Sequence, residues 1–300
     1  MNNKTLGLGL LLLLGFIWGT GYSIARFATT HGVPPLGYSF WQSVGPALLI
    51  AFLAKSQRDS IKLSATHVRY YCMCGLTGIV IPNTTMYFAA SHLPAGILAV
   101  VVNTVPIIAY PLALLLQAEK FNPFRLSGVL CAMCGLLLIL LPQTSLPAPD
   151  MFLWVLAALL TPFSFALCSV YISRYRPTDS SSVSLSAGTL IAASVILAPF
   201  VLGSGHFYSL HLPLTVPDWI VLLEIALSSA GYILFFQLIK IAGPVYYSLV
   251  DTIVALVGLW WGYIIFHERL NEWTFPAVLL IFIALILVTK PTTKPLTATA

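Results

Sequence analysis

The sequence predicts an all-α polytopic membrane protein with ten transmembrane helices, arranged as two inverted-topology five-helix repeats. Hydrophobic residues fill 59% of the 300 positions and charged residues 8%, and the mean hydropathy is +0.94, which exceeds what a water-soluble core of this size requires. The apolar residues fall into ten runs of about the 20 residues that a helix needs to cross a bilayer. A segment near the middle of the chain also recurs, in modified form, near its end.

Short polar connections separate the runs, five of which precede the connection at 142–150 and five of which follow it. The runs lie at about residues 6–28, 36–54, 69–91, 94–116, 124–142, 150–173, 183–203, 218–240, 244–266 and 273–290. They predict a first repeat over 1–142 and a second, inverted repeat over 150–290. The polar, proline-containing end at 291–300 predicts a disordered cytoplasmic tail.

The first run resembles a cleaved signal peptide only in having Lys4 before an apolar stretch. It exceeds signal-peptide length, and its text GFIWGTGY is a packing pattern rather than a small-residue cleavage site. We therefore predict a retained helix. G-x-x-x-G pairs, which let helices approach closely in lipid, occur here at Gly15 and Gly19 and in the ninth run at Gly258 and Gly262.

Basic residues indicate the orientation in the membrane. With the N-terminus inside, twelve of the fourteen Lys and Arg residues fall on cytoplasmic segments, and only Arg26 and Arg269 lie toward the other side. This positive-inside distribution predicts a multi-pass protein of the cytoplasmic (inner) membrane with both termini in the cytoplasm. Because the basic residues form no single patch, the net charge of +5 does not indicate nucleic acid. We expect a lipid bilayer and a small-molecule substrate as partners, and a monomer or weak homodimer.

The internal repeat aligns AEKFNPFRLSGVLCAMCGLLLILLP with HERLNEWTFPAVLLIFIALILVTKP. A constant offset of 149 positions matches Glu119 with Glu268, Asn122 with Asn271, and Pro142 with Pro291. Since five is odd, the two copies cross the membrane in opposite directions, with Glu119 inside and Glu268 outside. Inverted repeats of this kind are typical of secondary transporters.

Two acidic residues lie inside predicted spans, where a charge needs a partner or a water-filled cavity. Asp251 follows Pro244 by seven residues, which places it about 10 Å deep from the cytoplasmic side. Glu224 begins a stripe that continues through Ser228 and Tyr232 and should face inward. Both acids are candidates for proton or cation coupling. The alternatives are a structural hydrogen-bonded acid for Asp251 and a carboxylate that reaches headgroup water for Glu224.

Aromatic and amide side chains recur on predicted inner faces. Trp18, Tyr22 and Arg26 follow one another at intervals of four on the first span, so the two rings could line a cavity beside a cation. The alternative for Arg26 is snorkelling at the outer end. The full predicted substrate-binding set is Trp18, Tyr22, Asn83, Tyr87, Asn103, Tyr110, Tyr232, Gln237, Tyr247 and Asp251.

Prolines inside spans predict kinks, because each removes a helical hydrogen bond. They are Pro82, Pro106 and Pro162. Under the offset of 149, Asn103 falls within one position of Asp251. An internal twofold axis would then place an amide opposite an acid near the centre.

Enzyme signatures are not found. The sequence holds no H-E-x-x-H motif, no Walker loop and no defensible pair of buried nucleophile and base. Cys131-x-x-Cys134 lies in an apolar span, and His206, His211 and Asp218 match no tight metal site. We expect no enzymatic activity, no cofactor and no metal.

Three stretches resemble the drug/metabolite transporter superfamily, EamA type. They are FIWGTGY at 16–22, YFAASHLPAGILAVVVNTVPIIAYPLALLLQAEKFNPFRLSGVLCAMCGLLLIL at 87–140 and IAGPVYYSLVDTIVALVGLWWGYIIFHERL at 241–270. The resemblance implies ten spans in two inverted repeats and a carrier that moves small metabolites through a central cavity by alternating access. The chain departs from the family pattern at Gln42, where an arginine is frequent, and at Phe165, near a tryptophan position.

Together these features favour a secondary active transporter of a small amphipathic metabolite, an amino acid or related amine, with proton coupling or exchange as modes. The first alternative is efflux of lipophilic cations or drugs. An intramembrane enzyme and a passive channel are the remaining alternatives. The former requires a buried nucleophile and base, and the latter a continuous polar pore through both halves.

Overall fold

Helices make up every regular element that the computed structural model describes, over residues 3–102, 104–115, 121–140, 151–247, 250–267 and 272–289. The first half contains α1 (Asn3–Thr30), α2 (Pro35–Ser56), α3 (Ala65–Gly75), the π-helical turn η1 (Leu76–Val80), α4 (Ile81–Ala90), α5 (Ala95–Val102), α6 (Val105–Leu115) and α7 (Pro123–Leu140). The second half contains α8 (Met151–Ala158), α9 (Leu160–Tyr175), α10 (Ser182–Gly203), α11 (Val216–Tyr247), α12 (Val250–Phe266) and α13 (Thr274–Thr289).

Each of the ten predicted spans coincides with one of these helices or with consecutive ones. Five described segments are long and apolar enough, by length and composition, to cross a membrane: Leu6–Thr30, Pro35–Ser56, Met151–Ile172, Ser182–Gly203 and Val216–Phe235. Shorter apolar helices lie in three further spans, at Leu126–Gly135, Leu256–Phe266 and Thr274–Ala284. The all-α polytopic fold is thus confirmed, whereas the predicted tail over 291–300 lies outside the described residues.

Three spans depart from regular α-helix close to a proline. The turn η1 precedes Pro82, α6 begins one residue before Pro106, and α9 begins two residues before Pro162. The physical reason is shared: a proline disfavours helical geometry in the residue before it but fits the first turn of a new helix. The breaks therefore occur where the sequence predicts kinks.

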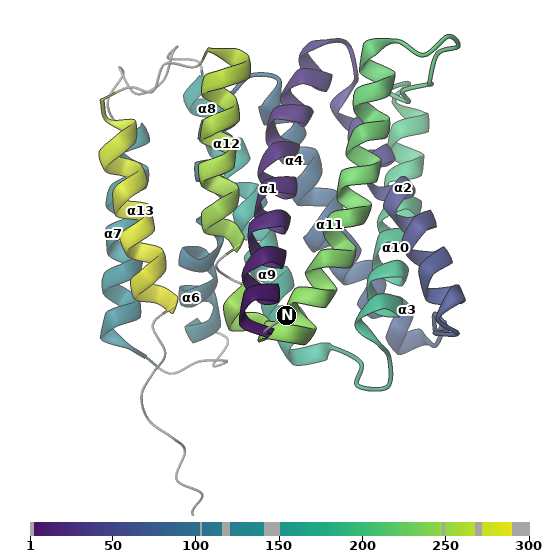
Figure 1. The fold of residues 1–300 in the computed structure, drawn as a ribbon, viewed down its shortest axis with the longest axis horizontal. Helices are drawn as coiled ribbons and strands as arrows, with labels where there is room; N and C mark the ends of the chain where they lie inside the picture. Colours follow the sequence, from purple (N-terminus) through teal and green to yellow (C-terminus); the bar gives the residue numbers. More distant parts are fainter. Residues whose placement is uncertain are drawn as a thin grey trace, which may run out of the picture.

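The predicted boundary between the eighth and ninth spans is wrong. The break expected between residues 240 and 244 does not occur, because α11 continues through Pro244 to Tyr247 and α12 begins at Val250. Proline is tolerated in a membrane helix when other groups satisfy the carbonyl that it frees. Asp251 is consequently the second residue of α12. The first turn of this helix lies part-way along the bundle rather than at its edge (Figure 1).

Helix contacts follow a twofold exchange of the two halves. The pairs α2 with α10 and α7 with α13 join equivalent spans, and they lie at opposite ends of the bundle (Figure 1). The contact of α1 with α11 is matched by that of α9 with α4, and the contact of α1 with α12 by that of α9 with α6. Such reciprocal contacts are what an internal twofold axis produces.

Glycines allow α1 to lie directly against α12. A methyl group added at Gly19 would lie 2.7 Å from Cβ of Val257 and 2.8 Å from the carbonyl oxygen of Val254. One added at Gly15 would lie 2.5 Å from Cβ of Ile253. Close backbone approach of this kind holds membrane helices together without a hydrophobic drive. The first G-x-x-x-G pair is therefore a packing site.

We predict that Gly19→Leu destabilises the protein in detergent by about 1–3 kcal/mol, the usual range for overpacking. The added side chain has no room beside Val257. Gly9→Leu on the same helix is the matched control, since a methyl group there meets no atom within 4 Å. Thermal unfolding of purified variants measures both. Equal melting temperatures for the two variants would contradict the assignment of Gly19 as a packing site.

Candidate functional site

A buried polar cluster lies where α2, α4 and α11 meet, and we call it the Glu224 cluster: Gln42, Asn83, Glu224 and Ser228. The exposed fractions of Asn83, Glu224 and Ser228 are 8%, 6% and 4%. Glu224 is therefore a buried carboxyl group and does not lie open to headgroup water, whereas its role in coupling stays a prediction. An acid at such a position needs polar partners within the protein.

Three hydrogen bonds connect the cluster and run in one direction. The Asn83 side-chain amide donates to Oε1 of Gln42 at 2.6 Å. Nε2 of Gln42 donates to the Ser228 hydroxyl at 3.4 Å, and this hydroxyl donates to Oε1 of Glu224 at 2.8 Å. Every donor points toward the carboxyl group. The other oxygen, Oε2 of Glu224, has no hydrogen-bond partner among the described residues.

Aromatic rings surround the carboxyl group. Tyr38, Tyr87 and Tyr232 each interact with Glu224 electrostatically. Tyr38 and Tyr87 also meet edge to face, with ring centroids 4.7 Å apart. Trp18 meets Tyr232 in the same way at 6.3 Å. Such rings offer negative faces to a cation and apolar surface to the rest of a ligand.

Helical spacing and glycines explain this arrangement locally. Glu224, Ser228 and Tyr232 recur every four residues on α11, so they share one face, and that face turns inward as predicted. Gly231 gives the Trp18 indole room against α11, since an added methyl group would collide with its ring nitrogen. Gly21 faces the carboxyl group, with an added methyl group 3.6 Å from Oε1.

The other predicted substrate-binding residues divide into three groups. Tyr22 is buried and interacts with Tyr87, so it adjoins the cluster. Tyr110 lies elsewhere, where its hydroxyl contacts the backbone of Asn122. Gln237 is exposed, because five residues beyond Tyr232 a helix has turned away from the inward face. Asn103 and the side chains of Tyr247 and Asp251 lie outside the described part of the chain.

Arg26 contacts the last residue of α12. Its guanidinium carbon lies 4.4 Å from the ring centroid of Phe266, over the ring face. One turn and a half earlier on α1, Thr20 accepts a hydrogen bond from the Trp261 indole at 2.9 Å. These contacts strengthen the junction of α1 with α12. Among the described residues, Glu224 forms no ion pair.

Sequence reasoning missed two members of the site. Tyr38 precedes Gln42 by four residues on the second span, so the two share one face, but this interval was not interpreted. Gln42 was noted only because it stands at a position where arginine is frequent in the family, and no role was predicted for it. The structure shows that it connects α4 to α11 through its amide.

Side chains from α9 donate hydrogen bonds to the backbone of the third span. Thr161 donates to the carbonyl of Pro82 at 3.0 Å, and Ser164 donates to the carbonyl of Thr77 at 2.6 Å. Farther along the same face, the Cys168 sulfur lies 3.9 Å from the carbonyl of Cys74. A π-helical turn and a proline leave carbonyl groups without helical donors, and in lipid these need partners from a neighbour. Helix α9 supplies them.

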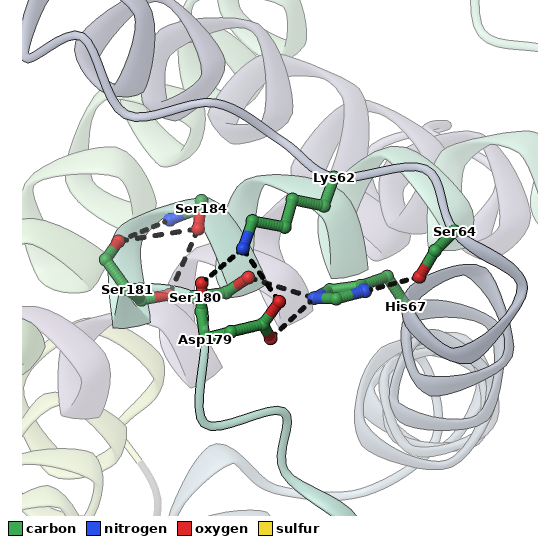
Figure 2. Close-up of polar contacts among 7 residues, drawn as sticks. All are labelled: Lys62, Ser64, His67, Asp179, Ser180, Ser181 and Ser184. Atoms are coloured by element: carbon green, nitrogen blue, oxygen red, sulfur yellow. Dashed lines mark hydrogen bonds and ion pairs between the residues drawn. The ribbon is translucent and has the colours of Figure 1, made fainter.

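A second polar cluster joins the two halves at one end of the bundle (Figure 2). Lys62, on the connection between α2 and α3, donates to Oδ2 of Asp179 at 2.7 Å, and Asp179 lies between α9 and α10. The His67 imidazole bonds the hydroxyls of Ser64 at 2.7 Å and Ser180 at 3.0 Å. The hydrogen bond from Lys62 lowers the pKa of the Asp179 carboxyl group below its ordinary value.

Comparison with known proteins places the chain among transporters. The model of the EamA-like transporter family matches residues 5–141 and again 152–290. Protein PecM of Dickeya dadantii is 26% identical over 277 residues, covering 91% of this chain and 88% of that protein. The riboflavin transporter of Brucella anthropi is 26% identical over 260 residues, covering 84% and 87%. A crystal structure with 15% identity superposes with a TM-score of 0.61 over 94% of this chain and 96% of the other, which shows the same fold.

We predict that acid destabilises the protein partly through Asp179. A carboxyl group whose pKa is lower in the folded state stabilises that state above its unfolded pKa. This contribution disappears as the pH falls through the folded pKa. Asp179→Asn and Lys62→Met should therefore lower the melting temperature near neutral pH and approach wild type below about pH 3. Thermal unfolding across pH checks this, with Lys55→Met, an exposed lysine on α2, as control. A deficit that persists unchanged at acid pH would contradict it.

Proposed function

The chain belongs to the EamA-like transporter family, and from that premise we propose that it is a secondary active carrier of a small amphipathic amine, with Glu224 as its anionic anchor. The protein is a membrane transporter of a small molecule and not an enzyme. The proposal adds the substrate class, alternating access between two inverted halves, and the inner membrane with both termini in the cytoplasm.

The proposed substrate class, an amine, is supported mainly by one observation. Glu224 is 6% exposed and forms no ion pair among the described residues. A buried carboxylate without a cation is costly, by several kcal/mol in a low-dielectric site. A bound ammonium group or a proton removes that cost. A carrier that exchanges one for the other at the same oxygen would couple substrate movement to proton movement.

The surroundings of Glu224 support an amphipathic rather than a purely polar substrate. The rings of Trp18, Tyr87 and Tyr232 offer flat apolar surface on one side of the carboxyl group. The amides of Gln42 and Asn83 lie on the hydrogen-bonded side. A ligand with a cationic end and an apolar body would use both, since ammonium groups bind over aromatic faces. Efflux of lipophilic cations uses the same groups and is the first alternative.

A second candidate is a neutral planar heteroaromatic compound. The relative from Brucella anthropi is named a riboflavin transporter. Paired amides such as Gln42 and Asn83 can match the amide edge of a fused ring system, and the tyrosine and tryptophan rings can stack on its faces. This candidate predicts binding that does not depend on the charge of Glu224.

We predict that primary amines raise the melting temperature of the purified protein and that Glu224→Gln abolishes the shift. Loss of an ion pair at a desolvated site corresponds to an affinity decrease of at least about tenfold. The screen compares amines, the matching neutral alcohols, quaternary lipophilic cations and riboflavin. Ser229→Ala is the control variant, because Ser229 lies beside Ser228 on α11 but bonds only to a backbone carbonyl in the described contacts.

Each outcome of this screen favours one substrate class. Stabilisation by quaternary cations without primary amines favours efflux of lipophilic cations. Stabilisation by riboflavin that survives Glu224→Gln favours the heteroaromatic candidate. An amine response retained in full by Glu224→Gln would remove Glu224 from the site.

We also propose that Asp251 takes part in cation or proton coupling, because it is an acid in the first turn of a helix that begins part-way through the bundle (Figure 1). Asp251→Asn should then reduce uptake of the stabilising amine into proteoliposomes at least about tenfold and weaken its pH dependence. Transport with the rate and pH dependence of wild type would exclude Asp251 from the mechanism. Counterflow by substrate on the far side separates a carrier from a passive channel in the same vesicles.

A further inference from the structure

The hydrogen bonds of the Glu224 cluster form a chain with a fixed direction. Asn83 donates to Gln42, Gln42 donates to Ser228, and Ser228 donates to Glu224. An amide can present either its oxygen or its nitrogen to a neighbour, so the direction is set by the groups at the two ends. The ionised carboxyl group can only accept, so it sets the direction from its end, and the Asn83 amide at the other end takes the matching orientation with its nitrogen toward Gln42.

Gln42 is the link that could face either way. With its oxygen toward Asn83, its nitrogen faces the Ser228 hydroxyl and occupies the acceptor side of that oxygen. The hydroxyl hydrogen is then directed to Oε1 of Glu224, at 2.8 Å. If Gln42 were reversed, its oxygen would compete with the carboxyl group for the same hydrogen. The orientation of Gln42 therefore controls whether Glu224 keeps its donor.

The hydrogen-bond chain ends at Asn83, in the third span. Asn83 directly follows Pro82, whose carbonyl oxygen accepts a hydrogen bond from Thr161 on α9. The π-helical turn η1 ends two residues before Pro82. The hydrogen bonds thus join a carboxyl group on α11 to the π-helical turn and proline of the third span, across α2.

We propose that Gln42 and Asn83 are positioning residues that hold the Ser228 hydroxyl toward Glu224. Through them, a change in the charge of Glu224 alters the third span near η1 and Pro82. This rests on the proposed role of Glu224 as the anionic anchor. When a proton or an ammonium group occupies the carboxyl group, it becomes a weaker acceptor, and the chain loses the group that sets its direction. The hydrogen bond from Asn83 to Gln42 is then weakened, next to Pro82 and η1.

An infrared double-mutant cycle tests the first link without any ligand. The spectrum of reconstituted wild type minus that of Glu224→Gln isolates the Glu224 carboxyl band in whatever charge state it has. The same subtraction is made in backgrounds carrying Gln42→Leu, Asn83→Asp or Ser228→Ala. We expect all three backgrounds to shift the band in the same sense, because each removes or redirects the donor to Oε1. Ser228→Thr, which keeps the hydroxyl, should restore the wild-type band.

Controls separate this effect from general damage. Ser229→Ala alters a hydroxyl on α11 that lies outside the hydrogen-bond chain, and it should leave the band unmoved. Asn83→Asp preserves the shape of the side chain while replacing its donor, so it serves if Gln42→Leu fails to fold. A Glu224 band unchanged in folded Gln42→Leu or Asn83→Asp would overturn the positioning role.

Hydrogen exchange tests the second link. Glu224→Gln should raise amide exchange in residues 76–90 at least about threefold relative to wild type, with α7 as an internal reference. Gln42→Leu should do the same, and the two changes together should add little more. Equal exchange in all variants would overturn transmission to the third span. Because no ligand is present, failure here is distinct from failure of the amine screen, which concerns the substrate alone.

Discussion

A π-helical turn and a proline inside a membrane helix disturb its hydrogen bonding, so backbone carbonyl groups there need donors from a neighbouring helix. The third span contains η1 and Pro82, and α9 lies against it, with Thr161 donating to the carbonyl of Pro82 and Ser164 to that of Thr77. These contacts fix where the first helices of the second half cross the first half. They also fix the position of Asn83, and through it one end of the Glu224 cluster.

The internal twofold relation shows how one scaffold supports two different chemistries. The junction of α9 with α4 and that of α1 with α11 are equivalent under exchange of the halves. At the first, short hydroxyl side chains satisfy backbone carbonyls. At the second, Gly231 makes room for the Trp18 indole, and Gly21 faces the Glu224 carboxyl group. Equivalent junctions in the two halves thus carry different side chains.

Much of the fold followed from one-dimensional patterns. Apolar runs predicted the spans, and the three interruptions lie beside Pro82, Pro106 and Pro162. The interval of four predicted that Glu224 and Ser228 face inward. Patterns were insufficient for individual side chains. Gln237 lies near the predicted stripe but off its face, Tyr110 contacts a connection instead of the centre, and the interval of four between Tyr38 and Gln42 was not used.

The fold class, the repeat and the inward face of α11 follow from the sequence alone, because these depend on hydrophobic periodicity and on the local geometry of proline and glycine. Which polar residues meet is evident only in the folded protein. Gln42 joins Asn83, 41 positions away, to Ser228, 186 positions away, and no spacing rule relates residues on three separate helices. The burial of Glu224 was settled in the same way, by the neighbours that α1, α2 and α4 place around it.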